Sequence, residues 1–363
     1  MRLELQRLTV LVGRNGSGKS NVADAFQFLA DCMSKGLPAA ITKRHGIGRV
    51  RRWSRGHPYD LTFGVDLDGD AWRGSYHFEL AGDATDEYRV KRELAEIGPK
   101  DQSEGPGHSF EVQGGSWKDG PIDLRPKADP ASLALPLVAG DERFHPLAEA
   151  LRTMARYSVF PDVLRMPQSY DPTFPMEEHG ANWVSVLRDQ EEWRGELLAA
   201  LGELTGDIKD MRVTQGGGFL VPEFLHGTGS EGGNGKRKKW FSSFQQSDGT
   251  LRFAGIVSAL LQRPVPTLVA IEEPELTLHP GAIPLLVDFI QQATETTQVV
   301  LTTQSPEILD VVDPDAVRVV ERIGGETTVR PVARSQMREV KEGLFTLGEI
   351  QRTEGLQQEL FDE

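Results

Sequence analysis

The feature that most constrains this chain is a glycine-rich segment near the N-terminus, Gly13-Arg-Asn-Gly-Ser-Gly-Lys-Ser20. Its spacing, Gly-x4-Gly-Lys-Ser, is that of a phosphate-binding loop. The apolar run over residues 8–12 before it is typical of a buried strand, and residues 21–29 after it place their apolar side chains on one helical face. A strand, a glycine-rich turn and a helix are the context that this motif requires, so the segment predicts a nucleotide site rather than a chance match.

The residue types of this loop explain how it would hold a polyphosphate. Glycine tolerates positive φ and lets backbone N–H groups approach anionic oxygens, which the start of the following helix also attracts. Lys19 would add a positive charge near the β- and γ-phosphates, and the Ser20 hydroxyl would bind Mg²⁺. The predicted nucleotide-binding residues of the loop are Gly13, Arg14, Asn15, Gly16, Ser17, Gly18, Lys19, Ser20 and Asn21.

Length and composition set broad limits on the kind of protein. The 363 residues allow one large domain or two, and 38% hydrophobic with 26% charged residues is ordinary for a globular chain. The sequence has neither a long apolar run nor a signal-peptide core, so no membrane span is expected and a cytoplasmic location fits. The single cysteine, Cys32, excludes an internal disulfide and a cysteine-based zinc site. We expect Cys32 to be a small core residue rather than a catalytic thiol, since no partner is indicated.

The formal net charge of −14 argues against nonspecific coating of nucleic acid by the whole surface, although it leaves a local basic patch open. One basic group lies in the Gly/Arg-rich residues 36–58 and comprises Lys43, Arg44, Arg49, Arg51, Arg52 and Arg55. It is either a solvated, partly mobile loop or a contact surface for nucleic acid or an acidic partner. The Gly-rich residues 226–239, which end in Lys236-Arg-Lys-Lys239, leave the same two alternatives.

Hydrophobic periodicity divides the rest of the chain into regions, each with its own expected secondary structure. These are an antiparallel sheet (59–97), a short hairpin around Phe110 and Trp117, a mostly helical lobe (132–205) that includes a strand at 157–160, paired strands near 211–221, a helix with two strands (306–330) and a tail (331–363) with a docking helix and a frayed end.

An acidic motif follows a second apolar run, residues 267–271, which is typical of a central parallel strand. Glu272 at the end of this strand can hold Mg²⁺ through water, and Glu273 can orient or deprotonate an attacking water. The alternative is a helix N-terminus that is simply rich in acids. Because the chain also carries the phosphate loop, we favour the catalytic interpretation of Glu272 and Glu273.

The segment Ser247-Asp-Gly-Thr-Leu-Arg252 precedes that strand and resembles the signature segment of ABC-type ATPases, in the variant of RecF-like, SMC-like and OLD-family proteins. The phosphate loop, the signature, the acidic strand end and Leu276-Thr-Leu-His-Pro280 occur in the order of that family. The chain therefore resembles ATPases of the bacterial AAA/RecF-like kind, strongly over residues 8–33 and 240–310 and more weakly over residues 157–190.

The resemblance implies an α/β fold, namely a P-loop ABC-type ATPase head with a central, mostly parallel sheet, an antiparallel β subdomain and a helical lobe. It implies one ATPase domain over residues 1–363. The expected pieces are 1–35 with the phosphate loop, 59–130 as the antiparallel β region, 132–205 as the helical lobe, 240–330 with the signature, the acidic strand and the switch strand, and the tail 331–363.

The resemblance also implies a mechanism in which ATP and Mg²⁺ make two chains pair head to tail. Ser247, Asp248 and Gly249 of one chain would meet the ATP held by the other, and loss of the γ-phosphate would open the dimer. Relatives act in DNA repair or antiphage defence, often beside a separately encoded nuclease, so such an effector or a nucleic acid is an expected partner and a membrane is not. A nucleotide-sensing regulatory scaffold with little hydrolysis is the main alternative. A transporter ATPase subunit fits less well, because the insertion over residues 36–240 is long for that role.

Two features depart from the family's pattern. The switch position, usually histidine, is Gln304, which can donate a hydrogen bond to the γ-phosphate but carries no positive charge, so hydrolysis is expected to be slow. The phosphate loop begins at Gly13, without the preceding strands that relatives usually have. The adenine pocket is therefore built otherwise, or the native start lies upstream of Met1.

Two further side chains have both a functional and a structural interpretation. Gln168 is either the Mg²⁺-contacting glutamine of the family or an ordinary loop glutamine. His279 is either catalytic or a capping and packing residue, and no histidine or cysteine is spaced to make it a metal ligand. The predicted catalytic residues are thus Glu273, Glu272 and Gln304, and the predicted metal-linked residues are Ser20, Glu272 and Gln168.

Overall fold

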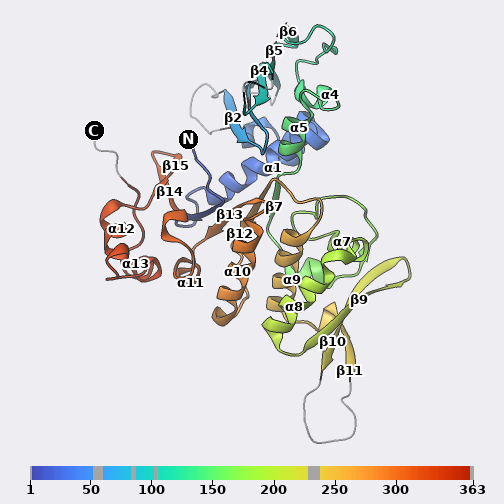
Figure 1. Cartoon of the computed structure of the whole chain (residues 1–363), viewed down its shortest axis with the longest axis vertical. Coiled ribbons are helices and arrows are strands. Elements are labelled where there is room, and N and C mark those ends of the chain that lie inside the picture. Colours follow the sequence, from blue (N-terminus) through green and yellow to red (C-terminus); the bar gives the residue numbers. More distant parts are fainter. Residues whose placement is uncertain are drawn as a thin grey trace, which may run out of the picture. The chain divides into compact units, whose positions relative to one another are not determined.

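The computed structural model describes residues 2–51, 60–82, 87–101, 103, 105–227 and 238–359. They fold into two compact units, the first formed by Met1–Phe26 and Ala155–Glu363 and the second by Gln27–Met154 (Figure 1). The long helix α1 (Lys19–Lys35) begins in the first unit and ends in the second. The predicted segments 1–35 and 132–205 both cross a unit boundary, and their assembly into one domain stays a prediction.

A six-stranded sheet is the centre of the first unit, with the strand order β15-β14-β1-β13-β12-β7. Its strands are β1 (Leu8–Val12), β7 (Ala155–Tyr157), β12 (Leu268–Glu272), β13 (Gln298–Thr303), β14 (Val317–Ile323) and β15 (Glu326–Pro331). All neighbours pair in parallel except β14 and β15. Strand β1 is buried throughout, and β12 and β13 nearly so, which explains their continuous apolar sequences. The predicted central, mostly parallel sheet is confirmed.

A helical region and a small antiparallel sheet complete this part of the first unit. The elements in chain order are α6 (Pro161–Arg165), β8 (Gln168–Ser169), α7 (Trp183–Asp189), η2 (Glu191–Trp193), α8 (Arg194–Thr205), β9 (Ile208–Gly216), β10 (Phe219–Gly227), β11 (Lys238–Ser242) and η3 (Ser243–Gln245). The paired strands predicted near 211–221 are confirmed. The strand predicted at 157–160 instead ends at Tyr157, because Pro161 begins α6. Lys236 and Arg237 of the second basic group lie outside the described residues.

Helix α9 is the centre of the packing in the first unit. The remaining helices are α9 (Asp248–Leu261), η4 (Pro280–Ala282), α10 (Ile283–Ala293), α11 (Pro306–Leu309), η5 (Pro314–Ala316), α12 (Arg334–Lys341) and α13 (Leu347–Thr353). Helices α6, α8 and α10 pack against α9, whose residues 250–260 are all buried. Figure 1 labels α8, α9 and α10. The tail contains two helices where one was expected, and Leu347 and Ile350 of α13 join the core.

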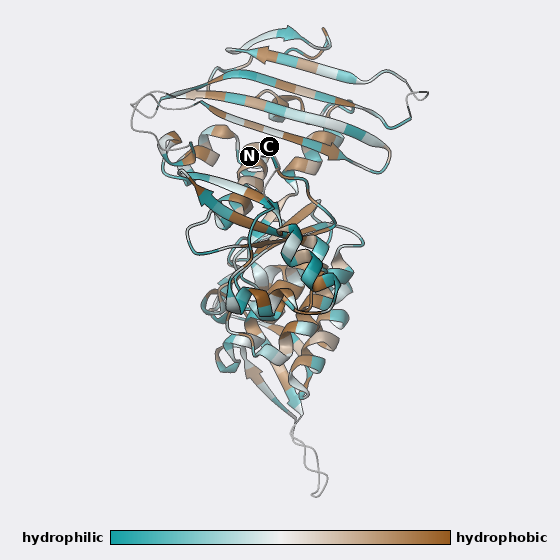
Figure 2. Ribbon diagram, turned by 90° about the vertical axis from the view of Figure 1, so that its left-hand side faces the viewer, coloured by the Kyte–Doolittle hydropathy of each residue, from teal (hydrophilic) through white to brown (hydrophobic). Residues whose placement is uncertain are grey.

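The second unit is built on a five-stranded antiparallel sheet in the order β2-β3-β4-β5-β6. The strands are β2 (Leu61–Asp68), β3 (Trp72–Gly82), β4 (Tyr88–Pro99), β5 (His108–Gln113) and β6 (Ser116–Asp119). Polar and apolar residues alternate along these strands (Figure 2), so one face is packed and the other faces water. Both the predicted antiparallel sheet and the predicted hairpin around Phe110 are confirmed.

The prediction of a loop over residues 36–58 is wrong for its first part. The helices of the second unit are α2 (Leu37–Lys43), α3 (Ile47–Val50), α4 (Leu135–Val138) and α5 (His145–Arg152). Lys43 and Arg44 lie 3.2 Å and 3.1 Å from the buried Asp31 carboxylate. Burial raises the pKa of Asp31, but these two cations outweigh that effect and lower it. Part of the basic group is therefore used inside the unit, and Arg52 and Arg55 lie outside the described residues.

Glu93 on β4 is a fully buried carboxyl group in the second unit. It accepts hydrogen bonds from the Tyr76 hydroxyl at 2.8 Å and from the backbone N–H groups of Ala134 and Leu135 at 2.5 Å and 2.8 Å. Burial raises the pKa of Glu93 to about 7, although the three donors act in the opposite direction. The carboxyl group thus joins β4 to the start of α4, and its charge is costly to bury.

We expect the stability of the chain to fall as the pH rises from about 4.5 to 7, by the contribution of Glu93. The unfolded carboxyl group ionises near its ordinary pKa while the folded group keeps its proton, a difference on the order of 3 kcal/mol. Urea unfolding of wild type and Glu93→Gln at several pH values measures this. The free energy of unfolding of wild type should fall relative to that of Glu93→Gln as the pH rises. For Glu96→Gln, at an exposed site on the same strand, the difference from wild type should not change with pH. A difference between wild type and Glu93→Gln that is constant with pH would contradict the expectation.

A candidate nucleotide site at the ends of the central strands

The phosphate loop joins the end of β1 to the start of α1. Gly16 and Gly18 have φ values of 77° and 107°, which favour glycine. A Cβ atom on Gly13 would lie 2.2 Å from the carbonyl oxygen of Val320, and one on Gly18 would lie 2.2 Å from Oγ1 of Thr327. The loop is therefore shaped by close contact with the β14–β15 hairpin, which the motif alone did not indicate.

Lys19 is buried beneath the loop, with 6% of its surface exposed. Its Nζ donates to the carbonyl oxygens of Gly13 and Arg14 at 2.7 Å and 3.3 Å. Burial lowers the pKa of Lys19, while nearby acids, Glu273 first, raise it. The ammonium group thus lies under a loop whose surface residues are exposed, and a phosphate could replace carbonyl oxygens as its acceptor. The exposed loop residues are Arg14, Asn15, Gly16, Ser20 and Asn21, whereas Ser17 is buried.

The predicted metal-linked pair, Ser20 and Glu272, is brought together by the parallel sheet. The Ser20 hydroxyl donates to Oε2 of Glu272 at 2.8 Å. Oε1 of Glu272 is buried and accepts no hydrogen bond from the described residues. A hydroxyl in contact with a carboxylate is a donor set that fits Mg²⁺ held by Ser20 directly and by Glu272 through water, although Oε1 also lies 2.9 Å from Nε of Arg156. Within the described ranges no three acids, histidines or cysteines form a metal site by themselves, so such an ion would also need phosphate or water oxygens.

Gln304 connects the predicted water-polarising acid to the phosphate loop. Its Nε2 donates to Oε1 of Glu273 at 2.9 Å and to Oδ1 of Asn15 at 2.7 Å. Glu273 has a φ of 42°, an unusual value for a residue other than glycine, and its N–H donates to the carbonyl oxygen of Thr302 at 2.8 Å. The structure thus brings Asn15, Glu273 and Gln304 together, and their chemical roles stay predictions.

The predicted signature residues form the start of α9. The Ser247 hydroxyl caps the helix by accepting from the N–H of Thr250 at 3.1 Å. Asp248 pairs with Arg165 of α6, and Gly249 lies so close to the carbonyl oxygen of Thr277 that a Cβ would be 2.9 Å from it. In the described part of the chain, Ser247 and Asp248 bond within this region rather than to the phosphate loop.

Gln168 and His279 have structural partners in this fold. The Gln168 side chain is buried, donates to the carbonyl oxygens of Val163 and Gly180, and accepts from the N–H of Val184 at 2.9 Å. A metal contact would need these bonds to break, and the metal role of Gln168 stays a prediction. His279 is exposed, and its Nδ1 accepts from the N–H of Gly281 at 3.1 Å, which is a capping contact.

Sequence patterns missed the roles of three charged groups at this site, of which Arg252 is buried and Glu275 and Arg156 are half-buried. Arg252 donates to the carbonyl oxygens of Val159, Glu273 and Glu272 at 2.7, 2.9 and 3.3 Å. Glu275 accepts from the Thr303 hydroxyl at 2.6 Å, and burial raises its pKa. Arg156 lies 2.9 Å from Glu272. Arg252 stands inside the predicted signature segment and Glu275 lies two positions after Glu273, whereas Arg156 had no sequence signal.

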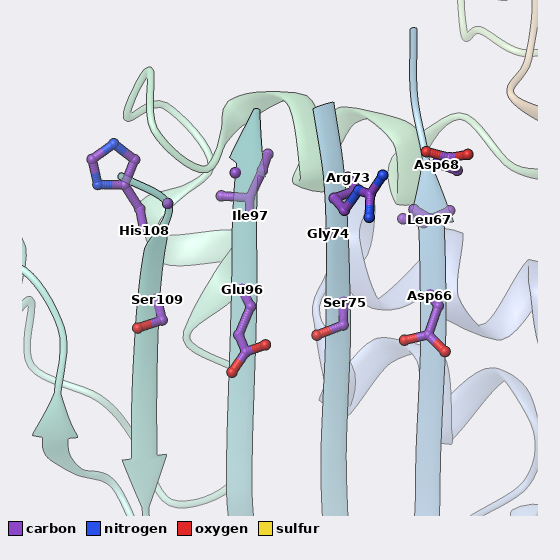
Figure 3. Close-up of a pocket in the computed structure, with 12 residues that line it drawn as sticks. Asp66, Leu67, Asp68, Arg73, Gly74, Ser75, Glu96, Ile97, His108 and Ser109 are labelled. Carbon is purple, nitrogen blue, oxygen red and sulfur yellow. The ribbon is translucent and has the colours of Figure 1, made fainter. Parts of the chain in front are cut away.

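A separate hollow of about 710 Å³ lies on the water-facing side of the sheet in the second unit. Figure 3 shows Asp66, Ser75, Glu96 and Ser109 side by side on four neighbouring strands, in agreement with their pairing. The hollow is an open sheet face with acidic and hydroxyl side chains. It contains none of the predicted nucleotide residues.

A family model described as "AAA domain, putative AbiEii toxin, Type IV TA system" matches residues 8–310. None of the curated proteins compared with the chain matches it. No helix in the described ranges has the length and apolar character that crossing a membrane requires.

Three solved structures are among those to which this chain is similar. One is the SmcHead bound to the C-winged helix domain of ScpA, with 13% identity and a TM-score of 0.49, covering 93% of this chain and 94% of that chain. The SMC head domain from Thermotoga maritima has 10% identity and a TM-score of 0.41, covering 91% and 92%. The Smc head domain with an extended coiled coil, bound to the C-terminal domain of ScpA derived from Pyrococcus furiosus, has 13% identity and a TM-score of 0.42, covering 94% of both.

We expect Arg252→Met to destabilise the chain by about 2–4 kcal/mol, because three carbonyl groups lose a buried charged donor. Urea unfolding measures the change. Arg263→Met is the matched control, since Arg263 also donates to two backbone carbonyl groups but is exposed, and its loss should cost less than about 0.5 kcal/mol. Equal effects of the two substitutions would contradict the role of Arg252.

Proposed function

The chain belongs to the AAA-domain family whose model matches residues 8–310, as its motifs predict, and we propose that it binds and hydrolyses ATP at the phosphate loop. One observation carries this proposal, namely the contact between Ser20 of the loop and Glu272 at the end of β12. These residues lie far apart in the sequence, and their meeting is what a Mg²⁺-dependent nucleotide site requires.

The loop would bind the phosphates through its backbone N–H groups and through Lys19. Mg²⁺, held by Ser20 and Glu272, supplies positive charge to the phosphate oxygens when it is bound. Glu273 would then accept a proton from the attacking water or orient that water. Gln304 already lies within hydrogen-bond distance of Glu273, so it could guide the same water or donate to the γ-phosphate. Because glutamine is neutral, we expect hydrolysis to be slow.

ATP binding would also join two copies of the chain. Ser247 and Asp248 are exposed at the N-terminus of α9, where helix N–H groups attract anions. We infer that these residues and Gly249 meet the ATP held by a second copy, which makes ATP the trigger for a homodimer. In this arrangement hydrolysis removes the bridge between the copies.

The biological role that we propose is a nucleotide switch in DNA repair or antiphage defence, acting in the cytoplasm with a separately encoded effector such as a nuclease. The family's description includes the words "putative AbiEii toxin, Type IV TA system", and we take this as support for a defence role. The second candidate is a nucleotide-sensing scaffold with little hydrolysis. It is favoured by Gln304, which bridges Asn15 and Glu273 without adding charge.

We expect Glu273→Gln to keep ATP binding, to lower the rate of hydrolysis by about 10²–10⁴-fold, and to hold an ATP-bound dimer, because a general base is removed. Rates of phosphate release and the mass from light scattering, with and without ATP and Mg²⁺, measure this. Lys19→Ala is the control and should neither bind ATP nor dimerise. If Lys19→Ala bound ATP as tightly as wild type, the site would be wrongly placed. If wild type already formed a stable ATP dimer, the scaffold would be the better description.

A nucleic-acid role predicts ATPase activity that rises when DNA or RNA is added. Neutralising Arg49, Arg51 and Arg52 should remove most of that increase, since cations that contact phosphates dominate such binding. Arg52 lies outside the described residues, and Arg49 is exposed on α3. The matched control neutralises Arg334, Arg338 and Lys341, which are exposed on α12 and should have no effect. Indifference of the wild type to every nucleic acid would contradict this role.

A further inference from the structure

Arg156 of β7 contacts three carboxylates in the first unit. Its Nη1 lies 3.0 Å from Asp24, its Nη2 lies 2.5 Å from Glu178, and its Nε lies 2.9 Å from Oε1 of Glu272. The three acids belong to α1, to the segment before α7 and to the end of β12. One guanidinium group thus links the helix that carries Ser20, the helical region and the predicted metal-linked acid.

The pairing of two strands explains this position. Strand β7 pairs in parallel with β12, so that Arg156 lies beside Ala270. Side chains alternate along a strand, so Arg156, Ala270 and Glu272 extend from the same face of the sheet. Ala155 and Tyr157 point to the opposite face and are buried in the core. The pairing of the two strands therefore places the guanidinium group next to Glu272.

The charge of Arg156 acts on the carboxylate oxygen that Ser20 leaves free. Ser20 donates to Oε2 of Glu272, whereas Oε1 is buried, accepts no hydrogen bond from the described residues and faces the guanidinium group. Only 17% of the Arg156 side chain and 13% of the Glu272 side chain are exposed, so water screens this interaction weakly. Asp24 and Glu178 neutralise part of the same positive charge.

We propose that Arg156 is a positioning residue that sets how strongly Mg²⁺ and nucleotide bind together at this site. The proposal rests on the proposed function. The guanidinium group orients Glu272 toward Ser20 and at the same time repels a divalent cation nearby. Glu178 moderates that repulsion, because it holds the guanidinium group and offsets its charge. The extent to which Mg²⁺ strengthens nucleotide binding would thus depend on the charges of both Arg156 and its acidic neighbours, rather than on Glu272 alone.

The test measures binding of N-methylanthraniloyl-ADP, a fluorescent nucleotide, in EDTA and in saturating Mg²⁺. The ratio of the two affinities is the coupling. Arg156→Met should raise the coupling by a factor on the order of ten, because repulsion is lost, and Glu178→Gln should lower it. Arg156→Lys keeps the charge and should stay near the wild-type coupling. Turnover should fall in both Arg156 variants, because neither methionine nor lysine can contact Asp24, Glu178 and Glu272 at once as the guanidinium group does.

A double variant separates the proposed route from a general effect of charge. If Glu178 acts through Arg156, Glu178→Gln should change the coupling less in the Arg156→Met background than in wild type. A coupling that is unchanged or lowered in Arg156→Met would overturn the proposal. If Arg156→Met does not fold, the proposal would instead be overturned by a coupling in Glu178→Gln that is unchanged or higher than in wild type.

The same measurements distinguish this inference from the proposed function. Wild type that binds no nucleotide, with or without Mg²⁺, would refute the proposed function itself. Wild type that binds nucleotide with Mg²⁺ coupling, but whose coupling does not respond to Arg156→Met or Glu178→Gln, would refute only the role of Arg156. Affinity in EDTA that stays at the wild-type value shows that a variant retains a folded nucleotide site.

Discussion

The parallel pairing of β1, β13 and β12 is the constraint on which the site depends. Val12 pairs with Thr303, and Thr302 pairs with Glu272, so the three strands end at one edge of the sheet. Each strand is followed at once by its predicted functional residues, because a parallel sheet gathers carboxyl ends. The phosphate loop, the two acids and Gln304 meet there although Asn15 and Gln304 are separated by 289 positions. A shift of one register position would turn Glu272 to the other face of the sheet.

Backbone geometry beyond the strand ends is held by buried polar groups. Glu273 adopts a left-handed backbone conformation, which costs free energy for any residue other than glycine. Contacts with neighbouring residues must stabilise this conformation. Arg252 does so by donating to the carbonyl oxygens of Glu272 and Glu273, while Thr302 accepts from the N–H of Glu273. The same Arg252 belongs to the helix that begins with the signature residues. The acidic strand end and the signature are thus parts of one packed structure in a single copy.

Sequence reasoning succeeded where several local signals agree, and failed where local signals conflict or where a contact joins distant residues. Residues 8–29 and 267–273 contain apolar runs, glycines and acids at fixed spacing. The strands and the helix predicted there are present in the structure as β1, α1 and β12. Helices α2 and α3 were missed because Gly36, Gly46 and the arginines suggested a loop, although Leu37, Ala40 and Ile41 have helical spacing. The partners of Arg156 could not be found in this way, since Asp24 is 132 positions away. No short pattern reports such a contact.

The charges around the proposed site give a physical reason to expect that Mg²⁺ and nucleotide would bind together. Two cations lie in a partly buried region close to acidic side chains. Burial lowers the pKa of both Lys19 and Arg252, whereas Glu273, Glu275 and Glu272 raise the pKa of Lys19, and Glu275 and Glu273 raise that of Arg252. A bound polyphosphate adds several negative charges beside these acids, and Lys19 alone cannot balance them. Mg²⁺ would supply the missing charge in the proposed site. Arg156 lies beside Oε1 of Glu272 and Ser20 beside Oε2, so a metal ion held by Glu272 would be expected on the side of Ser20.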